Sequence, residues 1–575
     1  MQETSKPTKP VIYQLFVRLF GNKKNNNVLH GDIKENGCGK FNDINDEVLK
    51  SIKELGVTHI WLTGIIEHAT CTDYSKYGLQ KDNPAVIKGR AGSPYAIRNY
   101  YQLDPDLAEN VNKRMSEFEA LIKRFHNNDL KLIIDFVPNH VARQYATDHM
   151  PEGIEALGVK DDKTKAFDPQ NNFYYLPGEK LIIPEEVKNL PYVDASDIEA
   201  YTENPAIVTG NDCFSNSPSY DDWYETIKIN YGVDYKNNRE CHFKPIPYTW
   251  HKMTNILFFW LEKGVDGFRC DMAEMVPVEF WNYAISQIKN KFPDSLFIGE
   301  IYNPDAYKSY IDTGKFDLLY DKEGLYNTLR GVIEGKLSAR MLSLCWQSLD
   351  GIDANMLRFL ENHDEQRIAS KQFADDPWRG IPGMVLSTSF NKGAVMIYFG
   401  QELGEAATEA SGFSGEDGRT SIFDYCTVPS VFNWLYNKSK LTEESKNLRK
   451  AYAEIMQLSK RPEIFDGNFY DLMWVNNDSD DFYGNYIYTY IRYLDEKAIL
   501  FVINFSKDQA LRTRIKIPAD FLELMNLDNY FDLYGKDIFP SGKMFTCNKN
   551  ELINNGIVII AEPNTAYAFE LEFLK

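Results

Sequence analysis

The sequence predicts an α/β protein: a (β/α)8 TIM barrel with an inserted subdomain after strand 3 and a C-terminal antiparallel β-sandwich. Three observations lead to this fold class. Short apolar runs alternate with helical patterns eight times, which favours a parallel sheet. One connection, after the third run, is far longer than the others. Beyond about residue 460, strand-like runs follow one another without helical patterns between them.

The eight apolar runs are the predicted barrel strands, at residues 11–17, 59–65, 131–137, 267–272, 296–301, 317–321, 355–362 and 394–400. Each run is nearly continuous in apolar residues, as is typical of strands buried on both faces. Helical patterns lie between them, at residues 46–56, 116–129, 254–264 and 277–290. Eight such units fit a closed barrel better than an open doubly wound sheet.

The long connection begins near Asn139 and ends near Tyr248, and it is rich in Pro, Gly, Asn and aromatic residues. A loop of this length inside a compact domain is normally functional or a small subdomain. The alternating runs at 483–494, 498–506 and 556–573 indicate antiparallel strands. The predicted domains follow from this division: barrel residues 1–140 and 248–460, an insertion over 141–247, and a β-sandwich over 461–575.

The composition of this chain of 575 residues limits the classes of molecule that it can bind. Its net charge of −20 repels phosphate backbones, so nucleic acid is excluded. No apolar run reaches the roughly 18 residues of a membrane helix. The polar start MQETSKPTKP predicts no signal peptide, which indicates a cytoplasmic protein, or a periplasmic or secreted one if a leader was removed. The eight cysteines form no CxxC pair, which argues against a zinc site, and free buried thiols are favoured over disulfides.

Titratable residues cluster where the predicted barrel strands end. They are Asp135, Asp271, Glu300, and His363 with Asp364. Barrel enzymes carry their active sites at this rim. Arg269 and Asp271 share strand parity, so both are expected to face the barrel axis. Crowded carboxylates raise one another's pKa, which suits a general acid, whereas a guanidinium keeps a nucleophilic carboxylate ionised. These two roles are those of a retaining glycosidase.

Four segments carry these residues: DFVPNH (135–140), GFRCDMAEM (267–275), FIGEI (297–301) and FLENHDEQR (359–367). They resemble the four signature regions of the α-amylase superfamily, glycoside hydrolase family 13, and the likeness runs through nearly the whole chain. The resemblance implies that Asp271 is the nucleophile, Glu300 the general acid and then base, and Asp364 the stabiliser of the transition state. It also implies a substrate-binding group, made of Tyr95, His140, Arg269 and His363.

Two features depart from the family pattern. Glu274 and Met275 stand where many α-amylases have Lys and His, so we expect a rebuilt acceptor side. Asn139 matches a calcium ligand of calcium-dependent members, although a turn-forming asparagine is the alternative. The loop 21–43 is similar to a calcium-binding loop, but Asn replaces most Asp there. No cofactor is expected for the chemistry, and a structural calcium ion stays open.

The function expected from this sequence is retaining hydrolysis of α-1,4-glucosidic bonds in starch-like polysaccharides or malto-oligosaccharides, through a covalent glycosyl-enzyme intermediate. The alternatives within the fold are a transglycosylase, an α-glucosidase or an isomerase acting on small α-glucosides. A non-catalytic carbohydrate-binding homologue is the remote alternative, and it would lack one of the three carboxylates. In the insertion, Tyr220, Trp223 and Tyr224 are candidate sugar platforms, with packing as the alternative.

Overall fold

The computed structural model describes residues 9–146, 150–349, 351–407, 417–527 and 530–574. Its barrel strands are β1 (Val11–Phe16), β2 (His59–Thr63), β5 (Lys131–Phe136), β12 (Gly267–Cys270), β13 (Leu296–Gly299), β14 (Leu318–Tyr320), β15 (Met356–Leu357) and β16 (Val395–Tyr398). Neighbouring strands are parallel and follow chain order, and β16 pairs with β1. A bridge from Arg358 to Val395 joins β15 to β16, so the sheet closes. The predicted barrel and its eight strands are confirmed.

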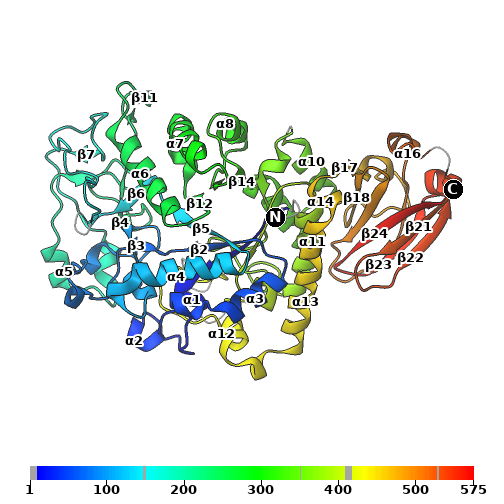
Figure 1. Ribbon diagram of the computed structural model, residues 1–575, viewed down its shortest axis with the longest axis horizontal. Helices are drawn as coiled ribbons and strands as arrows, with labels where there is room; N and C mark the ends of the chain where they lie inside the picture. The colour runs from blue at the N-terminus through cyan, green and yellow to red at the C-terminus, as the bar shows by residue number, and fades with distance from the viewer. Residues whose placement is uncertain (1–8, 147–149, 350, 408–416, 528–529, 575) are drawn as a thin grey trace.

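Helices cover the outside of the barrel (Figure 1). They include α3 (Asp46–Glu54), α4 (Arg114–Asn127), α6 (Tyr248–Glu262), α7 (Val278–Lys291), α9 (Asn327–Ile333), α11 (Ile381–Ser389) and α13 (Glu443–Gln457). The α3 helix shows how the sequence specifies them. The Asn45 side chain caps it by accepting from the Val48 amide, and its apolar residues form one buried stripe. Helix α6 begins six residues before the predicted pattern because Pro247 supplies its N-cap.

The barrel interior changes from apolar to polar along the strands. Its lower layers hold Ile12, Trp61, Ile133, Ile298 and Leu357, among others. Alternate residues of a barrel strand point inward, so the next inward layer contains the residues two positions further on. In β1 and β2 these are Gln14 and Thr63, which are joined by a hydrogen bond of 2.9 Å. The polar layer therefore lies at the carboxyl rim, directly beneath the expected active site.

The chain leaves the barrel after β5 and returns at α6. The described part of the inserted segment contains short strands, a 3-10 helix (Glu185–Asn189) and an α-helix: β6 (His140–Ala142), β7 (Tyr175–Leu176), α5 (Ala195–Ala200), β8 (Ala206–Ile207), β9 (Thr226–Lys228), β10 (Val233–Asp234) and β11 (Glu240–Cys241). It has a small apolar core around Tyr174 and Val208. Strand β6 pairs antiparallel with β9, and His140 lies opposite Lys228. This pairing brings the end of the insertion back to the barrel rim.

The C-terminal region forms an antiparallel unit at one end of the molecule (Figure 1). Six strands make its larger sheet: β17 (Asn468–Asp471), β18 (Ile487–Leu494), β19 (Lys497–Asn504), β24 (Thr565–Leu574), β21 (Asp532–Asp537) and β22 (Met544–Asn548). Strands β20 (Leu511–Ile515) and β23 (Ile557–Ala561) make a second, two-stranded sheet. We propose that the chain divides into domains after residues 140, 247 and 460.

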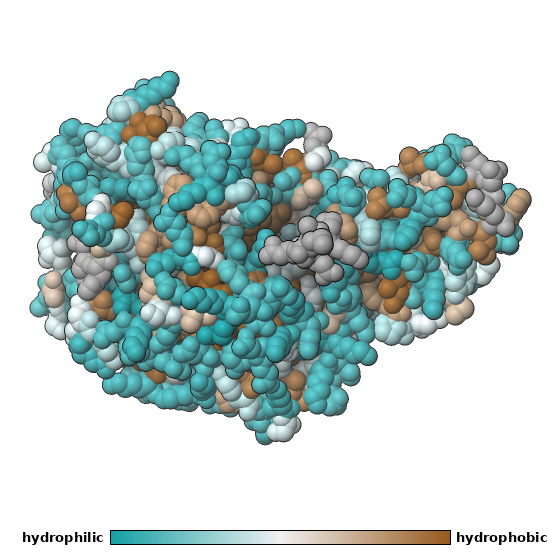
Figure 2. Space-filling view, viewed as in Figure 1, coloured by the Kyte–Doolittle hydropathy of each residue, from teal (hydrophilic) through white to brown (hydrophobic). Residues whose placement is uncertain are grey.

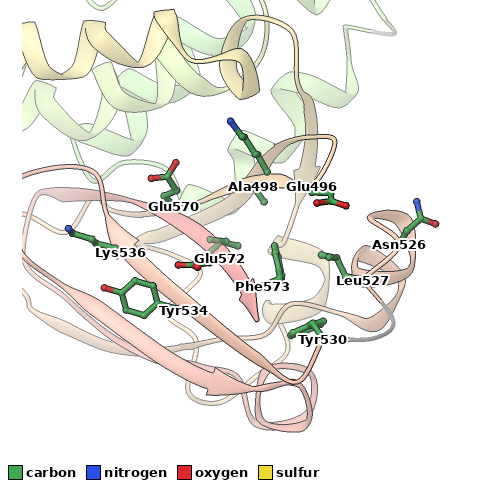
Figure 3. A pocket seen from close by; sticks show the side chains of 12 residues that line it. Glu496, Ala498, Asn526, Leu527, Tyr530, Tyr534, Lys536, Glu570, Glu572 and Phe573 are labelled. Atoms are coloured by element: carbon green, nitrogen blue, oxygen red, sulfur yellow. The ribbon is translucent and has the colours of Figure 1, made fainter. Parts of the chain in front are cut away.

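The surface in view is mostly hydrophilic, with apolar residues in small groups (Figure 2). A groove of about 590 Å³ lies on the larger C-terminal sheet, where Tyr534 and Lys536 of β21 neighbour Glu570 and Glu572 of β24 (Figure 3). None of the predicted site residues lines it. Across the described ranges, every helix is too short or too polar to cross a membrane. All eight cysteines are unpaired, as predicted.

Candidate active site

A pocket of about 210 Å³ opens at the carboxyl end of the barrel. Six of the predicted site residues line it: Tyr95, His140, Asp271, Glu300, His363 and Asp364. The seventh, Arg269, is fully buried and contacts two of these carboxylates. The structure thus brings together residues that are up to 269 positions apart in the chain, because five of them follow the carboxyl ends of barrel strands.

Arg269 is the centre of the carboxylate cluster. Its Nη1 lies 2.8 Å from Asp271 Oδ1, and its Nη2 lies 2.8 Å from Glu300 Oε1. Nη1 is also 3.3 Å from Asp135 Oδ1. Strand register explains this arrangement: Arg269 pairs with Asp135 across β12 and β5, and Cys270 pairs with Gly299 across β12 and β13. The residues that follow that last pair, Asp271 and Glu300, therefore lie side by side.

Burial makes the charges of this cluster strongly interdependent. The Arg269 guanidinium lies between 5.2 and 5.5 Å from the ring centres of Trp61, Tyr95 and Tyr320. Burial raises the pKa of Asp271, and the charge of Arg269 opposes that rise. Burial, followed by the charge of Glu300, raises the pKa of Asp364 to about 7. One guanidinium serves several carboxylates, so the cluster retains a proton near neutral pH.

Glu300 is fixed by two further hydrogen bonds. Its Oε2 accepts from the Met272 backbone amide at 2.6 Å, and its Oε1 accepts from the Tyr302 hydroxyl at 2.6 Å. Met272 has a φ of 43°, in the left-handed region that costs a non-glycine residue about 1–3 kcal/mol. Tyr302 was not among the predicted residues. Its signal in the sequence is a tyrosine two positions beyond a carboxylate that ends a barrel strand.

The two histidines are neutral. Burial, with Arg269 nearby, lowers the pKa of His363 well below its usual value, and burial lowers that of His140 to about 3. His363 Nδ1 lies 2.8 Å from Gln14 Nε2, and its Nε2 lies 2.5 Å from the Tyr95 hydroxyl. With Nδ1 accepting from the Gln14 amide, Nε2 donates to Tyr95. Tyr95 is also stacked on the His363 ring, at 5.3 Å between centres.

Only one of the three aromatic candidates in the insertion lines the pocket. Trp223 does so, and its ring centre lies 5.3 Å from that of His140. Tyr224 is 1% exposed and packs against Tyr220 at 5.2 Å between ring centres, so these two belong to the core of the insertion. The alternative of packing holds for that pair, whereas Trp223 is placed to contact a ligand.

Glu274 fixes the loop that follows Glu300. Its Oε2 accepts from the backbone amides of Tyr302 at 2.7 Å and Asn303 at 3.0 Å. The carboxylate that replaces the lysine common in the family thus bonds to the protein's own backbone. This contact explains the departure in the sequence as a means of positioning Tyr302, which in turn donates to Glu300.

The residues around Asn139 do not fit a calcium ion. Asn139 Oδ1 accepts from Lys228 Nζ at 2.8 Å, and the same ammonium lies 2.5 Å from Asp212 Oδ1. The Lys228 side chain is 1% exposed, and its ammonium lies 5.0 Å from the centre of the Tyr235 ring. A lysine ammonium therefore contacts the oxygens that a calcium ion would need. This contact favours the alternative to a calcium ligand at Asn139, and a structural calcium ion there stays an untested prediction.

The loop 21–43 is held in place by hydrogen bonds from two of its asparagine side chains. Asn22 donates to the carbonyl of Cys426 at 3.1 Å, and Asn36 donates to that of Tyr425 at 2.7 Å. Amide donors replace the carboxylates that calcium requires, and they tie this loop to the segment 425–427. Within the residues that the structure describes, no group of three or more His, Cys, Asp or Glu side chains is arranged to hold a metal ion.

A closed parallel barrel with paired carboxylates at its carboxyl rim defines a glycoside hydrolase. The family model for the catalytic domain of alpha amylase matches residues 14–463. The chain therefore belongs to the α-amylase family, glycoside hydrolase family 13, whose members act on α-glucans by a retaining mechanism without a cofactor in the chemistry.

Similar proteins include several activities. Alpha-amylase 2 of Dictyoglomus thermophilum is 22% identical, with 92% of this chain and 73% of the relative covered. The oligo-1,6-glucosidase of Parageobacillus thermoglucosidasius is 22% identical over 86% of this chain and 90% of its own length. A solved maltogenic alpha-amylase from Thermotoga neapolitana shares the fold, at a TM-score of 0.60, 20% identity, and coverage of 98% of this chain and 99% of that one.

Proposed function

We propose that this chain is a retaining α-glycosidase that hydrolyses α-1,4-glucosidic bonds in malto-oligosaccharides or starch-like chains. The observation that carries the proposal is the pair of contacts from adjacent nitrogens of Arg269 to Asp271 and Glu300. Holding both carboxylates on one guanidinium favours the short spacing of retaining enzymes, about 5–5.5 Å, over the roughly 6.5–9.5 Å of inverting enzymes.

In the first step Asp271 attacks the anomeric carbon, and Glu300 gives its proton to the glycosidic oxygen as that bond breaks. Arg269 supports the ionised form of Asp271 through its 2.8 Å contact. The products of this step are a glycosyl ester on Asp271 and a shortened sugar that leaves.

In the second step Glu300, now ionised, takes a proton from water, and the resulting hydroxide displaces Asp271 from the anomeric carbon. Asp364 binds hydroxyls of the same sugar and stabilises the oxocarbenium-like transition state. Neutral His140 hydrogen-bonds that sugar without adding positive charge next to it, and neutral His363, whose ring nitrogens contact Gln14 and Tyr95, positions Tyr95. Tyr95 packs on its face, supported by its hydrogen bond to His363.

The experiment that tests this proposal traps the intermediate. Incubation with 2-deoxy-2-fluoro-α-glucosyl fluoride is expected to label the protein once, and peptide mass spectrometry is expected to place the sugar on Asp271. The Asp271→Asn variant serves as the matched control and should take up no label. Maltoheptaose should be hydrolysed by the wild type and not by the variant. Labelling at another carboxylate, or an unlabelled but active wild type, contradicts the mechanism.

A further inference from the structure

Two charged side chains line the pocket and take no part in the carboxylate cluster. They are Lys88, which precedes Ser93 and Tyr95 in one wall segment, and Glu225, which precedes β9. Glu225 is 5% exposed, and its Oε2 has no hydrogen-bond partner among the described residues. The Lys88 ammonium lies over the rings of Tyr220 at 5.0 Å and Phe423 at 5.3 Å. A buried carboxylate oxygen without a partner is costly unless a ligand supplies one.

Lys88 and Glu225 form a second charged pair in the same pocket. Burial raises the pKa of Glu225, and the charges of Lys88 and Arg143 oppose that rise. The wall that carries Lys88 is fixed in place by Gly89. This glycine has a φ of 77°, and a Cβ there would meet the Phe423 carbonyl oxygen at 2.2 Å. The position of Lys88 is therefore set by the fold before any ligand arrives.

The size of the pocket limits what lies between its two ends. Its volume of about 210 Å³ is below the roughly 300–1,000 Å³ of pockets for drug-sized ligands. It suits a single sugar ring. In a glucose ring the C4 hydroxyl is on the opposite side from the anomeric carbon. With the anomeric carbon at Asp271, the C4 side of that ring is the side away from the reacting carboxylates.

We propose that Lys88 and Glu225 bind the hydroxyls on the C4 side of a non-reducing terminal glucosyl unit, so that the enzyme acts from the chain end. This inference rests on the proposed function. An ammonium donates to a hydroxyl oxygen and a carboxylate accepts the hydroxyl proton, so the pair satisfies both halves of one hydroxyl group. A glucan that continued beyond O4 would place its next ring against Lys88 and Phe423.

The first test compares two maltoheptaosides, one free and one chemically blocked at the non-reducing end. The wild type is expected to release sugar from the free compound and to cleave the blocked compound at least about 100-fold more slowly. Equal cleavage of both overturns chain-end action while leaving the proposed hydrolysis intact. Failure to cleave either compound, or α-glucosyl fluoride, instead contradicts the proposed function, so the two failures are distinguishable.

The second test isolates the contact itself. Lys88→Met and Glu225→Gln are assayed with α-glucosyl fluoride and with its 4-deoxy analogue. A charged hydrogen bond is worth about 10- to 100-fold in kcat/KM, so each variant should lose that much on the parent sugar. On the 4-deoxy sugar, which lacks the hydroxyl, the variants should match the wild type to within about threefold, as in a double-mutant cycle.

Lys497→Met is the matched control, because it removes an exposed lysine of the C-terminal groove. It should leave both rates unchanged. Thermal melting of all three variants checks that each is folded. Equal losses on the parent and the 4-deoxy sugar in a folded Lys88→Met protein mean that Lys88 does not contact that hydroxyl, and the proposal is then wrong.

Discussion

Lys228→Met tests whether a lysine ammonium stabilises the junction between the barrel and the inserted segment. The substitution removes the cation that joins Asn139 Oδ1 at 2.8 Å to Asp212 Oδ1 at 2.5 Å. Asn139 is 1% exposed, so its oxygen loses a partner that water does not replace. Asp212 keeps 28% of its side chain exposed, so solvent recovers part of its loss.

Breaking a buried pair costs about 3–5 kcal/mol, and the partial exposure of Asp212 places this case near the lower value, about 3 kcal/mol. In a chain of 575 residues that loss corresponds to a fall in Tm of roughly 2–3 °C. Thermal melting followed by circular dichroism measures it. The control is Lys263→Met, which removes the ion pair of 2.7 Å between Lys263 and Glu119. That pair is partly exposed, so its loss should cost at most about 1 kcal/mol.

The same argument predicts the response to calcium. Because Lys228 supplies the positive charge at Asn139, the wild-type Tm should be the same in excess EDTA and in millimolar calcium chloride. Two results would refute the reasoning. One is a Tm for Lys228→Met no lower than that of Lys263→Met. The other is a wild-type Tm that falls when calcium is chelated.

Three further predictions concern the carboxylate cluster and its neighbours. Tyr302→Phe removes the 2.6 Å hydrogen bond to Glu300, so kcat/KM on maltoheptaose should fall about tenfold. The fall on α-glucosyl fluoride should be smaller, because the fluoride leaving group needs less protonation. Equal losses on both substrates would contradict a role of Tyr302 through Glu300. Asp364→Asn should raise Tm relative to the wild type more at pH 8 than at pH 5. The folded-state pKa of Asp364, about 7, lies above its unfolded value, so the wild type loses stability as pH rises from the unfolded value through about 7. A difference in Tm between variant and wild type that does not depend on pH would contradict this prediction. Glu274→Lys leaves the backbone amides of Tyr302 and Asn303 without an acceptor, so the free energy of unfolding should fall by about 1–3 kcal/mol, as measured by thermal melting. A variant that melts at the wild-type Tm would show that other contacts hold the loop.

The barrel was predictable because each strand can be recognised from its own short sequence. A strand buried on both faces is nearly all apolar, and its last inward residue lies at the rim. The charged residues Arg269 and Asp271, at the end of such a run, are therefore expected at the rim. The same parity that places Trp61 in the apolar layer places Thr63 in the polar one. Local sequence was sufficient for the fold and for the carboxylates because the barrel repeats one geometry eight times.

The contacts that sequence reasoning missed join segments without such a repeat. Lys228 meets Asn139 across 89 positions, and nothing in the local sequence around either residue signals the other. The antiparallel pairing of β6 with β9, which sets His140 opposite Lys228, is what brings them together. Lys88 and Glu225 likewise come from two irregular segments that meet only at the pocket. Their proposed roles follow from tertiary position, and the sequence analysis did not single out either residue.

Glu274 and Glu225 differ in how far the protein satisfies their carboxylates. On the acceptor side, Glu274 uses its carboxylate to fix the loop of Tyr302, so that loop is held by the protein rather than by a sugar. Glu225, in contrast, keeps one buried carboxylate oxygen without a hydrogen-bond partner among the described residues. On the proposed chain-end action, the binding energy for a substrate is concentrated on the unit that enters the pocket, and little is committed to the units beyond the cut. A hydrolase arranged in this way should discriminate among sugars by their terminal ring, with chain length having a much weaker effect on kcat/KM.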